Sequence, residues 1–145
     1  MKVLIIHGPN LNILEKREPS IYGGKSLDEI NGLIMAKARE LDIEVEIFQS
    51  NFEGEIVEKI QSSMDSNIDG IIINPAAFTH YSIAIRDAIE VLDIPVIEVH
   101  LSNIYRREEF RAKSVIAPVC LGQITGLGIY SYLIAMEALK LLNQD

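Results

Sequence analysis

The sequence predicts an α/β protein with a mostly parallel sheet, folded as one domain. One observation favours the α/β class, and two favour a single domain. Short apolar segments typical of β-strands alternate along the chain with longer segments that have helical periodicity. The chain has 145 residues, enough for one domain with a sizeable core. We see no repeat, low-complexity tract or long linker, so we expect a single domain over residues 1–145.

Five segments are expected to form strands, because they are short and rich in β-branched residues. They are KVLII (2–6), EVEIFQS (44–50), GIIIN (70–74), PVIEVH (95–100) and SVIAPV (114–119). The second alternates polar and apolar side chains, and the fifth contains Pro118, which sheets tolerate mainly at an edge. The other three are nearly continuous apolar runs, as central parallel strands are. This predicts the order 2-1-3-4-5 of the flavodoxin-like fold, a three-layer, doubly wound parallel sheet.

Helices are expected between the strands, and the first has the clearest signals. The segment 27–41 has apolar residues at the spacing of one helical face: Ile30, Leu33, Ile34, Ala38 and Leu41. Ser26 and Glu29 form a capping box at its start. Further helices are expected at about 53–64, 80–92 and 126–142, with a short turn near 107–110. Strands that alternate with helices imply right-handed crossovers between parallel strands.

The charge of the chain limits its partners. The formal net charge at pH 7 is −8, so the molecule as a whole should repel nucleic acid and anionic membranes. Arg106, Arg107 and Arg111 nevertheless fall close together. They predict either a local anion-binding site or a solvated basic surface.

Cysteine content and hydropathy indicate where the protein works. The single cysteine, Cys120, excludes an internal disulfide and suits a reducing cytoplasm. The apolar run at the N-terminus is too short for a signal sequence. The longest unbroken apolar run near the C-terminus, 132–136, is too short to span a bilayer. We therefore expect a cytoplasmic protein without a membrane segment.

The three histidines mark a candidate site. His7, His80 and His100 lie at the ends of the first, third and fourth predicted strands, close to the point where the strand order reverses. Amide and hydroxyl side chains occur at the same ends: Asn10, Asn12, Asn74, Ser102 and Asn103. Ligands bind at this edge of doubly wound sheets, so we expect one polar crevice.

The fourth strand carries polar residues on one of its faces. Because successive side chains of a strand point to opposite faces, Glu98 and His100 share one face. A buried carboxylate without a partner is costly. Glu98 should therefore either pair with a helix arginine such as Arg86, or accept a hydrogen bond from His100 and favour its protonated form.

Missing motifs narrow the chemistry. The first loop, HGPNLN, has neither of the glycine patterns that hold phosphates, and no nucleophile elbow supports a Ser-His-Asp triad. The neutral asparagines suit hydrogen bonding better than metal ligation, so we expect no metal. An acid–base site for a small polyhydroxylated anion remains.

The segment EKREPSIYGGKS (15–26) supplies a further pair of residues. It places Arg17 and Tyr22 five residues apart, among two glycines and a proline. This pattern predicts either a mobile surface loop whose Tyr22 covers the sheet end, or a lid that closes an Arg–Tyr pair over a ligand.

Five motifs, in this order, resemble those of type II 3-dehydroquinate dehydratase (type II dehydroquinase): GPNLNILEKREPSIYG, QSNFEGEIVEKI, NPAAFTHYSIAIRDA, EVHLSNIYRREEFRAKS and GQITGLGIYSYLIA. The resemblance runs from the first strand to the last helix. It implies a flavodoxin-like catalytic domain that removes water from 3-dehydroquinate through an enolate, in the shikimate pathway, without cofactor, metal or Schiff base. Glu15 stands where the family commonly has glycine, a difference that concerns the lid.

The resemblance also implies roles for individual residues. Tyr22 is the base that takes the C2 proton, Arg17 activates it, and His100 is the acid that protonates the departing C1 hydroxyl. Asn10 stabilises the enolate oxygen through a water, and Glu98 orients His100. Contacts with the substrate are implied for Asn74, His80, Asp87, Ser102, Arg111 and the backbone amide of Leu101. Asp87 comes from a neighbouring subunit of a dodecamer, a tetramer of trimers.

Two other functions remain as alternatives. One is a different carbon–oxygen lyase or isomerase that acts on a related cyclic acid with the same Arg–Tyr pair. The other is a flavodoxin-like binding or signalling module that senses a small carboxylate. His7 has no role in the resemblance and is expected to be a hydrogen-bonded core histidine, and Tyr105, Tyr130 and Tyr132 are expected to pack.

Overall fold

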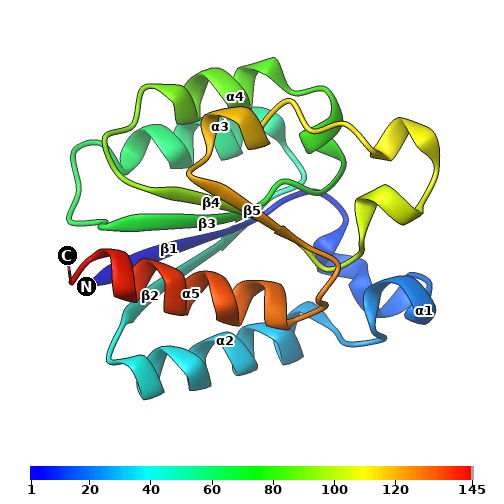
Figure 1. Cartoon of the computed structure of the whole chain (residues 1–145), viewed down its shortest axis with the longest axis horizontal. Helices are drawn as coiled ribbons and strands as arrows, with labels where there is room; N and C mark the ends of the chain where they lie inside the picture. The colour runs from blue at the N-terminus through cyan, green and yellow to red at the C-terminus, as the bar shows by residue number, and fades with distance from the viewer. Residues whose placement is uncertain (145) are drawn as a thin grey trace.

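A five-stranded parallel sheet forms the centre of the computed structural model, which describes residues 1–144 (Figure 1). Its order is β2-β1-β3-β4-β5, as the sequence predicts. The strands are β1 (Lys2–His7), β2 (Glu44–Gln49), β3 (Gly70–Asn74), β4 (Val96–His100) and β5 (Gly122–Thr125). His7 lies opposite Asn74, and His100 lies opposite Thr125. The ends of β1, β3 and β4 therefore meet at one edge of the sheet.

Helices cover both faces of this sheet (Figure 1). The helices are α1 (Pro19–Tyr22), α2 (Leu27–Leu41), α3 (Glu53–Ser62), α4 (Ile83–Glu90) and α5 (Tyr130–Leu142). α2 and α5 pack on one face, and α3 and α4 pack on the other. Alternate residues of each strand enter the two cores, so that Ile97 packs with α5 and Val96 packs with α4. This is the three-layer flavodoxin-like arrangement.

The first long helix begins as its sequence predicts. Ser26 Oγ accepts a hydrogen bond from the Glu29 amide at 3.1 Å, and Glu29 Oε2 accepts one from the Ser26 amide at 2.8 Å. This capping box satisfies backbone donors that the first helical turn leaves without partners. It also fixes where the segment that carries Arg17 and Tyr22 ends.

The predicted position of the fifth strand, 114–119, is wrong. The strand is Gly122–Thr125, and a 3₁₀ helix occupies Ala117–Val119. Pro118 has no N–H for a sheet ladder. The Ser114 hydroxyl accepts hydrogen bonds from the amides of Ile116 and Ala117, at 3.2 and 2.9 Å, and so turns the chain away from β4.

Other segments differ in their bounds. α4 begins at Ile83, three residues later than predicted, because Ala76–His80 form a separate 3₁₀ helix after β3. α5 begins at Tyr130, and the glycine-containing turn before it stays outside the helix. The turn predicted near 107–110 is two 3₁₀ turns, Ile104–Arg106 and Glu109–Arg111. Within residues 1–144, no helix is long and apolar enough to cross a membrane.

Candidate active site

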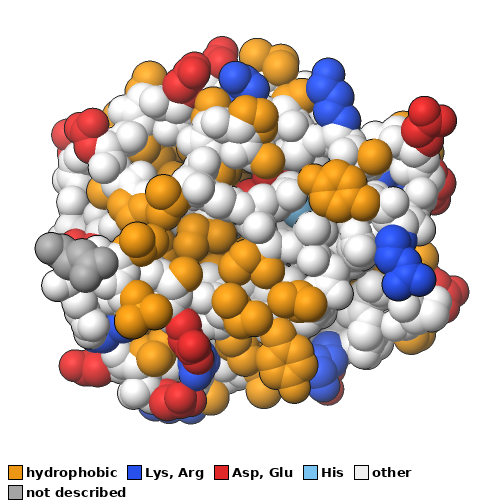
Figure 2. Space-filling view, viewed as in Figure 1, with side chains coloured by type: hydrophobic (Ala, Val, Ile, Leu, Met, Phe, Trp, Pro, Cys, Tyr) orange, Lys and Arg blue, Asp and Glu red, His pale blue; other side chains and the backbone are white. Residues whose placement is uncertain are grey.

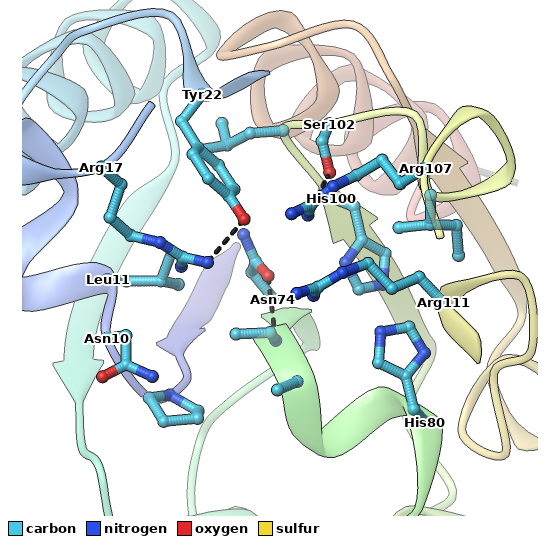
Figure 3. A pocket seen from close by; sticks show the side chains of 15 residues that line it. Asn10, Leu11, Arg17, Tyr22, Asn74, His80, His100, Ser102, Arg107 and Arg111 are labelled. Carbon is cyan, nitrogen blue, oxygen red and sulfur yellow. Dashed lines mark hydrogen bonds between the residues drawn. The ribbon is translucent and has the colours of Figure 1, made fainter. Parts of the chain in front are cut away.

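A pocket opens at the carboxyl ends of β1, β3 and β4 and holds about 470 Å³ of space when the part open to solvent is included (Figure 3). All of the site residues that the family resemblance implies, except Glu98 and Asp87, line it, whereas His7, Asn12 and Asn103 do not. The lining residues are Pro9, Asn10, Leu11, Arg17, Tyr22, Asn74, Ala76, Ala77, His80, His100, Leu101, Ser102, Ile104, Arg107 and Arg111.

A close backbone approach joins the two loops at the floor of the pocket. The Gly8 amide donates to the Asn74 carbonyl at 2.7 Å. A Cβ atom at position 8 would lie 2.6 Å from the Pro75 carbonyl oxygen, so only glycine fits there. Asn10 follows in the left-handed region, with φ of 67°, and its amide donates to Asn51 Oδ1 at 2.9 Å. The loops after β1, β2 and β3 are thus tied together.

Arg17 and Tyr22 meet at one wall of the pocket. Arg17 Nη2 donates a hydrogen bond to Tyr22 Oη at 2.5 Å, and the guanidinium carbon lies 4.1 Å from the centre of the Tyr22 ring. Tyr22 ends the short helix α1, and Gly23, with φ of 85°, closes that helix. Figure 3 shows the phenol oxygen pointing into the pocket between Arg17 and Asn74. The segment thus forms a wall that holds the pair together.

Arginine side chains make the pocket cationic, although the chain is acidic. The guanidinium of Arg107 lies 5.2 Å from the centre of the Tyr22 ring, and its Nη1 donates to Ser102 Oγ at 3.4 Å. Arg111 reaches the pocket from the 3₁₀ turn Glu109–Arg111, where its Nε donates to Glu108 Oε2 at 2.6 Å. Arg107 and Arg111 therefore lie at the pocket, where a local anion-binding site would need them. Arg106 is exposed and is not among the lining residues.

Glu98 and His100 form a buried pair behind the pocket. Glu98 is fully buried, and His100 Nε2 donates to Glu98 Oε1 at 2.6 Å. The alternative partner, Arg86, donates its Nη1 to the Val115 carbonyl at 3.0 Å instead. An acceptor on one ring nitrogen fixes the tautomer and the orientation of the imidazole.

His80 and Asn74 are each oriented by backbone contacts. His80 Nδ1 donates to the Lys113 carbonyl at 2.8 Å, which leaves Nε2 free to face a ligand. Asn74 Oδ1 accepts from the Ala76 amide at 3.1 Å, which leaves its amide nitrogen toward Tyr22 in Figure 3. Both side chains therefore present known atoms to the pocket.

His7 is a hydrogen-bonded core histidine, as expected. It is fully buried, its Nδ1 lies 2.9 Å from Tyr132 Oη, and its Nε2 donates to Asn31 Oδ1 at 2.8 Å. Burial lowers the pKa of His7 to about 4, and the bond to Asn31 opposes this only partly. His7 is therefore neutral near pH 7 and is not among the residues that line the pocket.

Two other predicted features lie away from the pocket. Asp87 is exposed on α4 and does not line the pocket within this chain. The Cys120 thiol is largely buried, and burial, with the charge of Glu98 as the next cause, raises its pKa to about 12. A thiol with so high a pKa is a poor nucleophile at neutral pH.

Several residues around the site cannot be identified from the sequence alone. Arg107 was seen only as part of an arginine group, and its contact with Tyr22 spans most of the chain. Thr79 and Ser114, which contact Glu98, gave no sequence signal. Apolar lining residues such as Ile104 resemble ordinary core residues in sequence.

The fold and the pocket define a flavodoxin-like α/β protein with a polar pocket, lined by arginine, histidine, asparagine and tyrosine side chains, at the carboxyl edge of its sheet. A family model described as dehydroquinase class II matches residues 1–140, and the chain belongs to this family.

Individual relatives agree with this assignment. The chain is 59% identical over 139 residues to a 3-dehydroquinate dehydratase of Caldicellulosiruptor saccharolyticus, with 96% of each chain covered. It is 60% identical over 141 residues to the same-named protein of Dictyoglomus turgidum, with 97% of each covered. The crystal structure of a type II dehydroquinase from Butyrivibrio crossotus superposes with a TM-score of 0.94 at 50% identity, covering 96% of this chain and 97% of that one.

Proposed function

We propose that this protein removes water from 3-dehydroquinate with Tyr22 as the base and His100 as the acid. As a member of its family the protein is a 3-dehydroquinate dehydratase, a hydro-lyase. Tyr22 takes a proton from C2, and the electrons of that bond pass to the C3 carbonyl to give an enolate. The C1 hydroxyl then leaves as water with a proton from His100, and a C1–C2 double bond forms.

The contact between Arg17 and Tyr22 carries this proposal. A phenol is a useful base only as its phenolate, and free tyrosine ionises near pH 10. The Arg17 guanidinium, 2.5 Å from the phenol oxygen, stabilises the negative charge of the phenolate. The Arg107 guanidinium near the same ring adds to this field.

The pairing of His100 with Glu98 supports the role of the acid. The carboxylate accepts a hydrogen bond from Nε2, so that the other ring nitrogen belongs to the pocket. A general acid must hold its proton at the working pH, and a buried carboxylate partner favours that state. Asn10, at the pocket's edge, is assigned to the enolate oxygen through a water.

The remaining lining residues suit the rest of the substrate. A carboxylate and several hydroxyls need both donors and acceptors, and the pocket offers them from Asn74, His80, Ser102, Arg111 and the backbone amide of Leu101. The family relation and this donor set together support a cyclic hydroxy acid.

The test is ultraviolet absorbance after the protein is mixed with 3-dehydroquinate. The conjugated enone product absorbs, and the substrate does not. We expect a signal from the wild type and none from Tyr22→Phe, which keeps the ring and removes the ionisable oxygen. Tyr105→Phe, which alters an exposed tyrosine outside the pocket lining, is the matched control and should keep full activity. Full turnover by Tyr22→Phe would refute the assignment of the base.

We further propose that the enzyme works in the cytoplasm, in the shikimate pathway, as a dodecamer built as a tetramer of trimers. Hydrophobic side chains gather over α5, α2 and β5 on the face seen in Figure 2. Exposed apolar residues on or next to these elements are Leu33, Met35, Leu121, Leu127, Tyr130, Ile134, Leu141 and Leu142. Asp87, exposed on α4, is assigned to a neighbouring subunit's pocket.

Native mass spectrometry tests this assembly, and a mass of one or two chains would contradict it. Asp87→Asn tests the shared pocket. We expect a raised KM for Asp87→Asn with an unchanged native mass.

A further inference from the structure

Two hydroxyls that the assigned roles do not use surround the Glu98 carboxylate. Thr79 Oγ1 is hydrogen-bonded to Glu98 Oε1. Ser114 Oγ lies 3.0 Å from both Glu98 Oε1 and Oε2. Together with His100 Nε2, three polar groups therefore meet this one buried carboxylate.

The hydrogen positions in this cluster follow from the partners of Ser114. A serine hydroxyl has one hydrogen to donate and two lone pairs to accept with. Ser114 Oγ accepts from the Ile116 amide at 3.2 Å and from the Ala117 amide at 2.9 Å, which uses both lone pairs. Its own hydrogen must therefore be donated, and the acceptors within reach are the Glu98 carboxylate at 3.0 Å and Thr79 Oγ1 at 2.7 Å.

The same count fixes the direction of the Thr79 hydroxyl. Thr79 Oγ1 lies 2.7 Å from Ser114 Oγ as well as against Glu98. Because the lone pairs of Ser114 are already used, Thr79 donates its hydrogen to Glu98. Ser114 therefore donates either to the carboxylate or to Thr79 Oγ1, and in both cases the Thr79 hydroxyl donates to Glu98.

We propose that Ser114 and Thr79 are positioning residues that keep Glu98 ionised, and so keep on His100 the proton that the proposed reaction consumes. Hydrogen bonds to the charged form of a carboxyl favour that form. A neutral glutamic acid would need an acceptor for its own hydrogen, and of these three groups only His100 Nε2 could take that role, in the tautomer that carries its hydrogen on Nδ1. This role goes beyond the proposed function. It rests on that function in one respect, that the reaction consumes the His100 proton.

A short segment holds this arrangement rigid. The Val115 amide donates to the Thr79 carbonyl at 2.8 Å, and Arg86 Nη1 donates to the Val115 carbonyl at 3.0 Å. Two residues before Val115, the Lys113 carbonyl accepts from His80 Nδ1. Residues 113–115 thus orient a pocket histidine and the support of the acid together.

Other titratable groups face this pair from several elements. Cys120, before β5, lies close enough for the charge of Glu98 to affect it, and it stays neutral because burial raises its pKa. His80, Arg107 and Arg111 line the same pocket as His100. These groups remain in every variant below, so they do not change between the samples that are compared.

The experiment compares four variants: Thr79→Val, Thr79→Ser, Ser114→Ala and Ser114→Thr. Thr79→Val is the deciding variant, because it keeps the side-chain shape, whereas Ser114→Ala also leaves two backbone amides without an acceptor. We expect Thr79→Val to lower kcat about tenfold, the order of effect of one hydrogen bond to a charged group, and to change KM less than about threefold. Thr79→Ser and Ser114→Thr, which keep the hydroxyl, should restore most of kcat.

A second readout needs no substrate. Nitrogen NMR of the His100 ring, assigned with a His100→Gln sample, reports whether the ring is protonated. In Thr79→Val we expect the pH at which half of these rings are protonated to fall by about one unit, which is the same tenfold factor. Ser63→Ala is the control, since it removes a buried hydroxyl that bonds only to the Ile60 carbonyl. It should change neither readout.

The outcomes separate this inference from the proposed function. If the wild type converts 3-dehydroquinate and Thr79→Val leaves both kcat and the His100 titration unchanged, the inference is overturned and the function stands. If the wild type shows no turnover, the function fails, and the NMR titration still decides the inference. A loss of kcat that follows only a loss of thermal stability, with an unchanged titration, also overturns it.

Discussion

Replacing Arg17 with glutamine removes the positive charge closest to the Tyr22 oxygen. The wild-type guanidinium donates to that oxygen at 2.5 Å, and its central carbon lies 4.1 Å from the ring centre. Glutamine keeps a polar side chain but no charge. The main effect should therefore be electrostatic, on the fraction of Tyr22 present as phenolate.

The size of the effect follows from the distance of 4.1 Å between the guanidinium carbon of Arg17 and the centre of the Tyr22 ring. Two unit charges about 4 Å apart interact by about 4 kcal/mol at an effective dielectric constant of about 20. Arg17 and Tyr22 are both partly exposed to solvent, and a doubled effective dielectric constant would leave about 2 kcal/mol. Since about 1.4 kcal/mol is a factor of ten, we expect the phenolate fraction, and with it kcat, to fall by about 30- to 1,000-fold.

The assay is the ultraviolet absorbance of the enone product at saturating 3-dehydroquinate, measured across pH. Arg17→Gln should recover part of its activity at high pH, where the phenol ionises without help. Arg17→Lys should lose less kcat than Arg17→Gln, because lysine keeps the positive charge although it lacks the planar guanidinium. Arg39→Gln, an exposed arginine at the end of α2, is the control and should be unchanged. A kcat within twofold of wild type for Arg17→Gln would refute the electrostatic argument.

Three further predictions use other parts of the structure. Arg107→Gln should lower kcat less than Arg17→Gln and raise KM, because Arg107 lies farther from the Tyr22 ring and also contacts Ser102; an unchanged KM in steady-state kinetics would contradict this. His7 has its pKa lowered to about 4, below its value in the unfolded chain, so the unfolded state binds more protons and stability should be lost as pH falls from 6.5 toward 4. The loss should approach about 3 kcal/mol in urea unfolding, and His7→Gln should flatten the pH profile; the same slope in both proteins would refute the assignment. Ser26→Ala should lower the free energy of unfolding by about 1 kcal/mol without changing kcat, and an unchanged Tm would show that the capping box adds nothing.

The strand order was predictable because it depends on how buried each strand is. This pattern gives the correct order even when the residue range of one strand is predicted wrongly. β2 is at least partly exposed along its whole length, whereas every residue of β3 is buried, and these patterns reflect an edge and a centre. The fifth strand was placed eight residues too early because SVIAPV has β-type composition. Its conformation is set instead by Ser114, whose partners could not be read from the local sequence.

The site was predictable in outline for a similar reason. The ends of parallel strands must meet at one edge, so His80, His100 and Asn74 could be expected to converge without knowledge of any distance. Which histidine faces inward could not be derived this way. His7 stands opposite Asn74 in the sheet, yet it turns to Tyr132 and Asn31.

Contacts between side chains far apart in sequence were beyond prediction. Arg107 approaches Tyr22, and Thr79 meets Ser114, only once the layers have packed. Their residue types are common on any surface or in any turn. Physical patterns of the sequence therefore identify the crevice, and the folded chain identifies the groups that tune it.

The main-chain contact between Gly8 and Pro75 makes the width of the crevice a property of the peptide backbone. Even one added methyl group at position 8 would press against a carbonyl that cannot swing aside, and would spread the two loops before any group that touches substrate had changed. Substitutions of side chains at the rim can thus alter which molecules bind, while the backbone keeps the width of the crevice constant.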